Sequence, residues 1–214
     1  IPLRLVGSEM CIRDRIRRHV PEFQGPLTAE KFSGGQSNPT FKLTAGDRQY
    51  VLRRKPQGTL LASAHAVDRE FKVLSALSST NVPVPVPVAL CEDETIIGSM
   101  FYVMEYLEGR IFWDPALPEV NDADRGEIYD QMNQVLADMH NVDIHAVGLS
   151  DYGKPGNYFE RQIGRWTKQY RAAETTRIPA MEKLIEWLPN HMPEDDGRVS
   201  LVHGDYRLDN MIFH

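Results

Sequence analysis

His203-Gly-Asp-Tyr-Arg-Leu-Asp-Asn210 is the most informative stretch of this 214-residue chain. Asp205 is followed five positions later by Asn210, in what we expect to be a loop between short strands at 199–202 and 211–213. A carboxylate there can orient an attacking hydroxyl and accept its proton, and an amide oxygen can hold a hard cation beside phosphates. The spacing favours phosphoryl transfer, but a polar turn satisfying its own backbone groups explains it equally well.

A glycine-containing turn lies far upstream between two strand-like segments. It consists of Gly34, Gly35, Gln36, Ser37 and Asn38. Glycine lets the backbone approach a phosphate closely, and the N–H groups of such a turn can bind an anion. A plain hairpin turn is the commoner structure for two adjacent glycines, so this feature is weak evidence when taken alone.

A cation and a carboxylate follow that turn. Arg53 ends a predicted strand that resumes at Tyr50, and Glu70 lies on a helix predicted over 63–79, with Ser63 as its cap. A strand cation held by a helix carboxylate can be aimed at nucleotide phosphates. The alternative is an ordinary surface ion pair worth less than about 1 kcal/mol.

The remaining pattern predicts an α+β chain, with strands first and helices later. The proline-rich run 82–88 must be extended, and 99–107 reads as a buried strand that ends before Gly109. Helices are predicted from Asn121 or Asp122, over 158–170 and from Pro179.

The order of these features resembles the protein-kinase-like fold, in its aminoglycoside phosphotransferase and choline kinase branch. The resemblance implies two lobes. Residues 24–107 are expected to form a lobe with an antiparallel sheet and one helix, and 108–214 a mostly helical, incomplete lobe. The glycine after His203 is typical of kinases that act on small molecules.

The family's site residues carry over by position. Asp205 is implied as the catalytic base and Asn210 as a magnesium ligand, while His203 braces the loop. Arg53 is implied on the phosphates of ATP, tethered by Glu70. The remaining nucleotide contacts are implied for the turn Gly34 to Asn38 and for the backbone of Glu105, Tyr106 and Leu107.

Three departures from the family pattern stand out. Arg53 replaces the usual lysine and offers a fork rather than a point charge, and the turn lacks a complete glycine motif. The family pattern also has a second metal-binding Asp, which is expected shortly after His214 and so is not among these 214 residues. We therefore expect little or no turnover from these 214 residues alone, and a non-catalytic nucleotide- or acyl-CoA-binding pseudokinase fragment is the alternative.

Within that branch, residues 151–170 resemble the phosphotransferase domains associated with acyl-CoA dehydrogenases. This implies a hydroxylated acyl-CoA as substrate and fusion or partnership with such a dehydrogenase. Arg161 and Arg165 share a helical face with Lys168 that can meet an anion, and Trp166 lines a neighbouring face. The alternative is a solvated basic stripe beside core aromatics.

Composition narrows the remaining classes. With 24 basic and 30 acidic residues the net charge is −6, which disfavours a nucleic-acid partner. The sequence contains no run of 18 apolar residues, so we expect no membrane span. Two cysteines cannot form a disulfide framework, so a cytoplasmic setting is expected. We interpret residues 1–23 as a tail, solvated or spurious, whose first 15 residues resemble a sequence artefact, and a genuine arm is the alternative.

Overall fold

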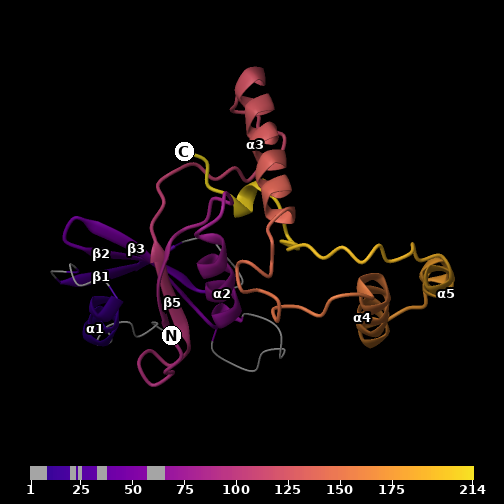
Figure 1. Ribbon diagram of the computed structural model, residues 1–214, viewed down its shortest axis with the longest axis horizontal. Helices are drawn as coiled ribbons and strands as arrows, with labels where there is room; N and C mark the ends of the chain where they lie inside the picture. Colours follow the sequence, from indigo (N-terminus) through magenta and orange to yellow (C-terminus); the bar gives the residue numbers. More distant parts are fainter. Residues whose placement is uncertain (1–8, 20–22, 24–25, 33–37, 57–65) are drawn as a thin grey trace. The chain divides into compact units, whose positions relative to one another are not determined.

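A computed structural model describes residues 9–19, 23, 26–32, 38–56 and 66–214 of the chain (Figure 1). Its sheet has five strands in the order β1-β2-β3-β5-β4, and all neighbouring strands are antiparallel. The strands are β1 (Leu27–Lys31), β2 (Thr40–Ala45), β3 (Arg48–Arg54), β4 (Pro87–Cys91) and β5 (Phe101–Glu105).

The hairpin between β2 and β3 forms where the sequence predicts a turn. Ala45 pairs with Arg48 and leaves a two-residue loop, whose first residue, Gly46, has a φ of 63°. Glycine enters this left-handed region without steric cost, which suits a tight hairpin. The hairpin leads into β3, which is the middle strand of the sheet.

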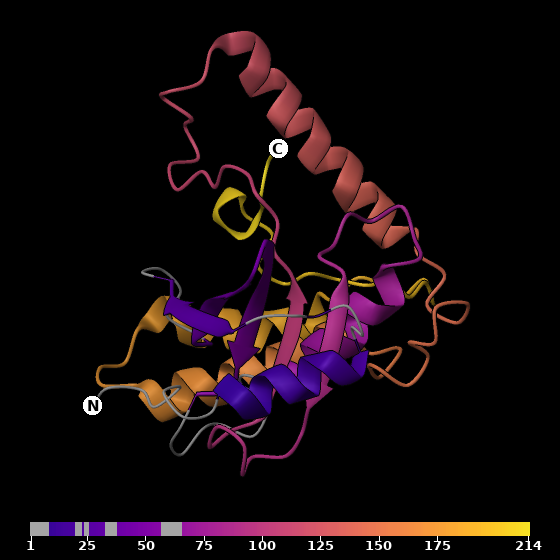
Figure 2. The same cartoon turned by 90° about the vertical axis from the view of Figure 1, so that its left-hand side faces the viewer.

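Alternation along the strands gives the sheet two different faces. Leu52 and Val103 are fully buried on the face that α1 (Glu9–His19) covers. Their neighbours Arg53 and Tyr102 therefore point to the opposite face, toward α2 (Val67–Leu77). Figure 2 shows α1 running along the sheet.

Helix α1 corrects the interpretation of residues 1–23 as a solvated tail. Ile12 and Ile16 are fully buried in the core of the sheet, and a guanidinium nitrogen of Arg15 donates to the carbonyl of Leu90 at 3.1 Å. The two isoleucines lie one helical turn apart, so a single face of a largely basic helix enters the core. The basic residues surround that buried face.

Three longer helices follow the sheet: α3 (Asp122–His140), α4 (Tyr158–Ala173) and α5 (Pro179–Trp187). The side chain of Asn121 accepts a hydrogen bond from the N–H of Asp124 at 2.9 Å and so caps α3, as predicted. Pro179 occupies the first turn of α5, also as predicted. Two short 3-10 turns, η1 (Leu188–Asn190) and η2 (Leu208–Asn210), complete the elements.

Two predicted strands near the end of the chain are wrong. Residues 199–202 form no strand, and Val199 and Val202 are about half exposed. Phe213 makes only an isolated antiparallel bridge to Arg110. An apolar run becomes a strand only where a neighbour satisfies its backbone groups, and the described part of the chain offers 199–202 no such neighbour. The predicted cap of α2, Ser63, lies outside the described residues.

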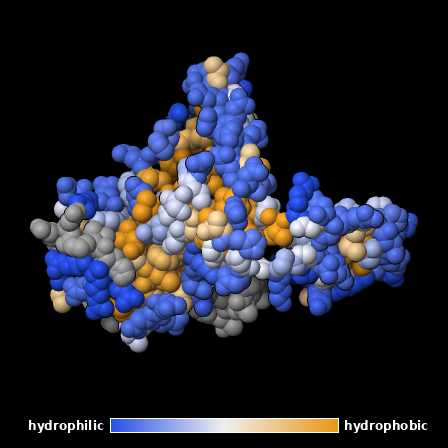
Figure 3. Space-filling model, viewed as in Figure 1, coloured by the Kyte–Doolittle hydropathy of each residue, from blue (hydrophilic) through white to orange (hydrophobic). Residues whose placement is uncertain are grey.

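The chain divides into two compact units, residues 1–142 with 202–214 and residues 143–201. The first holds the sheet, α3 and the catalytic-loop candidate, and the second holds α4 and α5. The lobe boundaries 24–107 and 108–214 stay a prediction. Hydrophobic residues remain at the surface in places (Figure 3). The tryptophans Trp113, Trp166 and Trp187 are also exposed. No helix in the described residues is both long enough and apolar enough to span a membrane.

Candidate active site

The predicted pairing of Arg53 with Glu70 is confirmed. Arg53 leaves β3 on the face toward α2, and its Nε lies 2.8 Å from Oε2 of Glu70. The contact is an ion pair rather than an aligned hydrogen bond, because the Nε–H does not point at the carboxylate. Both side chains are about one-third exposed. The two terminal nitrogens of Arg53 donate no hydrogen bond to another described residue, so the guanidinium fork is available to an anion.

Two further donors converge on the Glu70 carboxylate. Asn38 Nδ2 donates to Oε1 at 2.8 Å, and the hydroxyl of Tyr102 donates to Oε2 at 3.1 Å. Asn38 is almost fully buried, so its side chain holds the helix carboxylate from the end of the glycine-containing turn. Residues 33–37 of that turn lie outside the described residues. Burial, followed by the nearby charge of Glu70, raises the pKa of Tyr102.

The segment after β5 leaves backbone groups open. Glu105 is tied to Val86 twice, by its backbone N–H at 2.8 Å and by its side-chain Oε2 at 3.2 Å. Lys42 places its Nζ 4.4 Å from the ring centroid of Tyr106. The backbone of Tyr106 and Leu107 makes no hydrogen bond within the described chain, so these groups are available to a planar, hydrogen-bonding ligand.

The loop 203–210 is anchored to α3 and the segment before it. Leu208 is 4% exposed and packs with Leu117, Val120 and Ile128. The hydroxyl of Tyr206 donates to the carbonyl of Met132 at 2.6 Å. These contacts hold the backbone of the loop in place, and the polar side chains of the loop project toward solvent.

Asp205 and Asn210, the pair whose spacing favours phosphoryl transfer, are in direct contact within this loop. Asn210 Nδ2 donates to the backbone oxygen of Asp205 at 2.9 Å and to its Oδ2 at 3.0 Å. Gly204 has a φ of 83°, a conformation that glycine adopts without strain, and this turns the chain into Asp205. The Asp205 side chain is 64% exposed, so a substrate hydroxyl can reach it.

His203 lies beside Asp205 as a supporting group. Its Nδ1 is 3.3 Å from the backbone N–H of Asp205, and its ring meets that of Tyr206 edge-on at 5.7 Å. An accepting Nδ1 places the imidazole proton on Nε2. These contacts fit a bracing residue, which is the role that the family resemblance implies.

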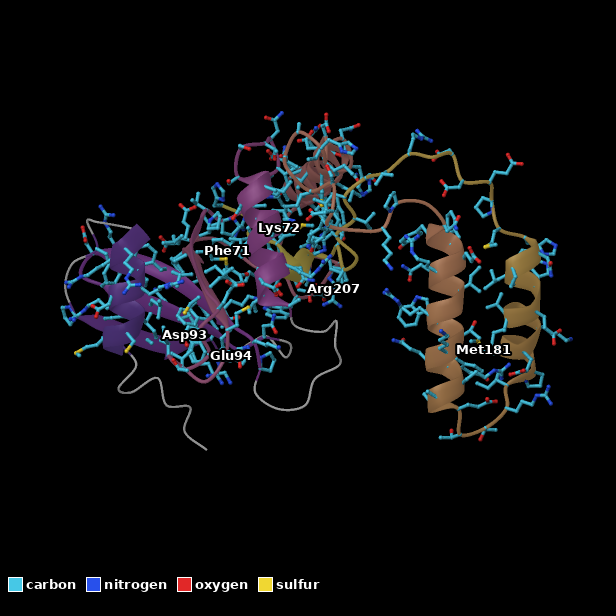
Figure 4. All side chains as sticks on the ribbon, turned by 60° about the horizontal axis from the view of Figure 1, so that its bottom comes forward. Phe71, Lys72, Asp93, Glu94, Met181 and Arg207 are labelled. Carbon is cyan, nitrogen blue, oxygen red and sulfur yellow. The ribbon has the colours of Figure 1, made fainter. Side chains whose placement is uncertain are left out.

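Sequence reasoning missed Arg207, which is labelled in Figure 4. Its Nε lies 3.3 Å from Oδ1 of Asp205, and its NH2 lies 2.6 Å from Oδ2 of Asp209. The signal was present in the alternation of acidic and basic residues along the loop. The cation offsets part of the negative charge that the two carboxylates bring together.

The donor set suits a hard cation such as magnesium. Asn210 uses its amide nitrogen on Asp205, which leaves its Oδ1 without a hydrogen bond among the described residues. A carboxylate and an amide oxygen are ligands that magnesium accepts, with water and phosphate oxygens supplying the others. The described residues contain no cluster of three His, Cys, Asp or Glu side chains suited to a metal. The residues present therefore fit a cation shared with phosphates rather than a closed protein cage.

The basic stripe on α4 lies in the second unit and is considered by itself. A shallow hollow along α4 is lined by Asn157, Glu160, Arg161, Gly164, Arg165, Lys168 and Gln169. Arg161 donates to the carbonyls of Lys154 and Gly156, so it secures the start of the helix. Arg165 and Lys168 have no partner among the described residues. Trp166 is 63% exposed and so is no core aromatic, whereas Arg165 and Lys168 are solvent-exposed, as the alternative of a solvated stripe expects.

Comparison with known proteins identifies the family. Residues 28–214 match the phosphotransferase enzyme family. The chain belongs to that family. The match includes Arg53, Glu70 and the entire loop 203–210, and the five-stranded antiparallel sheet with helices is the kinase-like fold of aminoglycoside phosphotransferases.

Curated relatives of this phosphotransferase-family chain are much longer. The chain is 56% identical to acyl-CoA dehydrogenase family member 10 of Mus musculus over 190 residues, which are 89% of this chain and 18% of that protein. It is 47% identical to family member 11 of Rattus norvegicus over 203 residues, 93% of this chain and 26% of that protein. The chain thus spans about a fifth to a quarter of these relatives.

Solved structures agree on the fold. A candidate aminoglycoside phosphotransferase from Ralstonia eutropha is 53% identical with a TM-score of 0.85, covering 96% of this chain and 60% of its own. An aminoglycoside phosphotransferase bound to streptomycin and ATP is 18% identical with a TM-score of 0.63, covering 98% of this chain and 67% of its own. At that identity the second likeness speaks for the fold alone.

Proposed function

We propose that this chain carries the site of an ATP-dependent phosphotransferase that acts on a hydroxyl group of a small molecule. The observation that carries the proposal is the pairing of Asp205 with Asn210 in an anchored, solvent-facing loop. One amide group fixes the carboxylate through its nitrogen and keeps its oxygen for a cation. Membership of the phosphotransferase family supports the same chemistry.

In the proposed reaction, Asp205 holds the acceptor hydroxyl and takes its proton. The hydroxyl oxygen forms a bond to the γ-phosphorus of ATP as the bond to the ADP oxygen breaks, so ADP leaves and a phosphate monoester forms. Magnesium bound beside Asn210 would neutralise charge on the phosphate oxygens. Arg53 contributes its free guanidinium fork to the phosphates.

The adenine end is assigned to the segment after β5. The unpaired backbone groups of Tyr106 and Leu107 can exchange hydrogen bonds with a purine edge, and Glu105 is held in place by Val86. Gly34 to Ser37 remain the proposed phosphate-contacting turn on the basis of their sequence. Asn38 joins this site through its contact with Glu70.

The proposed acceptor is a hydroxylated acyl-CoA. The long relatives are named as acyl-CoA dehydrogenase family members, which supports fusion to, or partnership with, such a dehydrogenase. Arg165 and Lys168 present unpaired positive charge on α4, and a CoA-linked acid is anionic. Arg161 is the weaker candidate because its guanidinium already serves two backbone carbonyls, and exposed Trp166 offers an aromatic surface nearby.

The test uses the protein as its gene encodes it. We would incubate it with ATP, magnesium and hydroxyacyl-CoAs that differ in hydroxyl position, and detect phosphorylated product by mass spectrometry. The matching acyl-CoAs without a hydroxyl, and kanamycin, serve as controls. Phosphorylated hydroxyacyl-CoA supports the proposal. Nucleotide binding without any phosphorylated acceptor would instead indicate the non-catalytic alternative.

A matched pair of variants tests the acceptor surface. Arg165→Ala is expected to raise the KM for the acyl-CoA by about threefold to tenfold, as loss of a charge-assisted contact should. Lys183→Ala removes an equal charge from α5, away from the hollow, and is expected to leave that KM unchanged. Equal effects of the two variants would remove α4 from the proposal.

A further inference from the structure

The Glu70 carboxylate is held from three directions by three separate parts of the fold. Arg53 approaches from β3, Tyr102 from β5, and Asn38 from the end of the glycine-containing turn. Arg53 and Tyr102 are direct cross-strand partners, so both side chains leave the sheet on the face toward α2. A glutamate with two hydrogen-bond donors and one ion-pair partner cannot rotate freely without losing at least one of these contacts.

Tyr102 is built into this arrangement. Tyr102 is only 3% exposed, and its ring packs edge-on against Phe71 of α2 at a centroid distance of 6.0 Å. A buried hydroxyl needs a partner, and among the described residues the Tyr102 hydroxyl donates to Oε2 of Glu70, the same oxygen that Arg53 approaches. The phenol and the guanidinium therefore contact the same carboxylate oxygen.

We propose that Tyr102 is a positioning residue of the phosphate site: with Asn38 it fixes the Glu70 carboxylate, which in turn sets the direction of the Arg53 guanidinium. The inference rests on the proposed function, since the direction of Arg53 matters only if its free nitrogens meet phosphate. It adds to that function by linking the glycine-containing turn, β5 and α2 through one carboxylate. Binding of phosphate by Arg53 is then preorganised rather than assembled on contact.

The surroundings of the Tyr102 hydroxyl also determine its protonation state. Burial and the negative charge of Glu70 both raise the pKa of Tyr102, so its hydroxyl stays protonated through the whole neutral and mildly alkaline range. Of the charged groups in contact with it, Glu70 disfavours ionisation and Arg53 favours it, and the outcome is an upward shift. Tyr102 thus acts as a permanent donor to Glu70 and not as a proton carrier.

The decisive variant is Tyr102→Phe, which removes the hydroxyl and keeps the ring against Phe71. In the protein as its gene encodes it, we expect the dissociation constant for ATP–magnesium, measured by calorimetry, to rise about threefold to tenfold. The KM for ATP should rise by the same factor, while the KM for the acceptor stays unchanged. Tyr129→Phe, which removes a hydroxyl that donates to the carbonyl of Pro115, should leave both constants unchanged.

A double mutant separates positioning from packing. In a Glu70→Gln background, Tyr102→Phe should add little further loss of ATP affinity, because both changes disrupt the same contact. The inference would be overturned if the losses of ATP affinity in the two single variants multiplied in the double variant, or if Tyr102→Phe left ATP affinity unchanged. A loss of ATP affinity in Glu70→Gln would in either case still support the phosphate site. If the unaltered protein binds no nucleotide, the proposed function falls and this inference with it. A purely structural tyrosine would lower the unfolding midpoint and leave the dissociation constant alone.

Discussion

At the scale of single residues, the candidate site combines local contacts with contacts between distant parts of the chain. Asp205 and Asn210 are five positions apart, and one turn of the loop brings them together. Arg53 and Glu70 could be paired because strand and helix follow one another. Tyr102 lies 32 positions from Glu70, and no spacing marks that hydrogen bond. Only strand register and burial reveal it.

Asn210 has two proposed tasks, and one substitution removes both. Asn210→Ala removes both the hydrogen bonds to Asp205 and the free oxygen proposed for magnesium. We expect kcat to fall at least tenfold, and the magnesium concentration needed for half-maximal rate to rise, because an oxygen ligand is lost. Steady-state rates measured across a magnesium titration check this. An unchanged magnesium requirement would show that Asn210 is no ligand.

At the scale of elements, α1 shows why the amino-terminal prediction was wrong. Two isoleucines four residues apart in a run of arginines give only a weak apolar periodicity, and their burial depends on a sheet that forms later in the sequence. The strand predicted at 199–202 failed for the opposite reason: its residues are apolar, but no described neighbour pairs with them. Helices α3, α4 and α5 carried their own signals of capping, first-turn proline or periodicity and were placed correctly.

Helix α1 makes a quantitative prediction for stability. Ile16→Ala deletes fully buried methylene and methyl groups and leaves a cavity, so the free energy of unfolding should fall by about 2–4 kcal/mol. Met10→Ala on the same helix changes a side chain that is 64% exposed and should alter it by less than about 0.5 kcal/mol. Denaturant unfolding of both variants is the measurement. Equal, small effects would mean that α1 does not dock on the sheet.

The α4–α5 pair should respond to acid. Arg171 lies within hydrogen-bond distance of Glu182, with NH2 to Oε2 at 2.7 Å, and this contact lowers the pKa of Glu182 below its ordinary 4.5. The pair therefore stabilises the folded helices above about pH 4.5 and loses that contribution as the pH falls through the lower folded pKa. The protection factors of the α5 amides, which are exchange rates corrected for the intrinsic pH dependence, should fall on acidification. Glu182→Gln should remove this response, and Glu186→Gln should keep it.

At the scale of the whole molecule, the two units differ in how much they bury. Leu52, Val103 and Phe101 of the sheet are fully buried, whereas α4 and α5 contain no buried residue. The boundaries between the two units, at 142–143 and 201–202, could not be predicted from the sequence. Helical periodicity shows that one face of a helix is apolar, but it does not show which part of the chain covers that face. The family membership predicted from the order of motifs is confirmed over residues 28–214.

This difference in burial predicts a difference in local stability. In the 214-residue chain, backbone amides of β3 and β5 should exchange with solvent much more slowly than those of α4 and α5, since few apolar contacts oppose local opening of the helices. Hydrogen–deuterium exchange followed by mass spectrometry resolves the two regions. Equal protection of both would contradict the division into a well-buried and a poorly buried unit.

In the proposed reaction, Asp205 takes the proton of a hydroxyl during phosphoryl transfer. The most direct measurement compares Asp205→Asn with the unaltered protein, each as the gene encodes it, in transfer from ATP to a hydroxyacyl-CoA. Asparagine keeps the size of the side chain and removes its basicity, so kcat should fall by about 10²–10⁴-fold while ATP affinity is retained. An Asp205→Asn variant that transfers phosphate at the original rate would contradict the proposed role of Asp205 as the base.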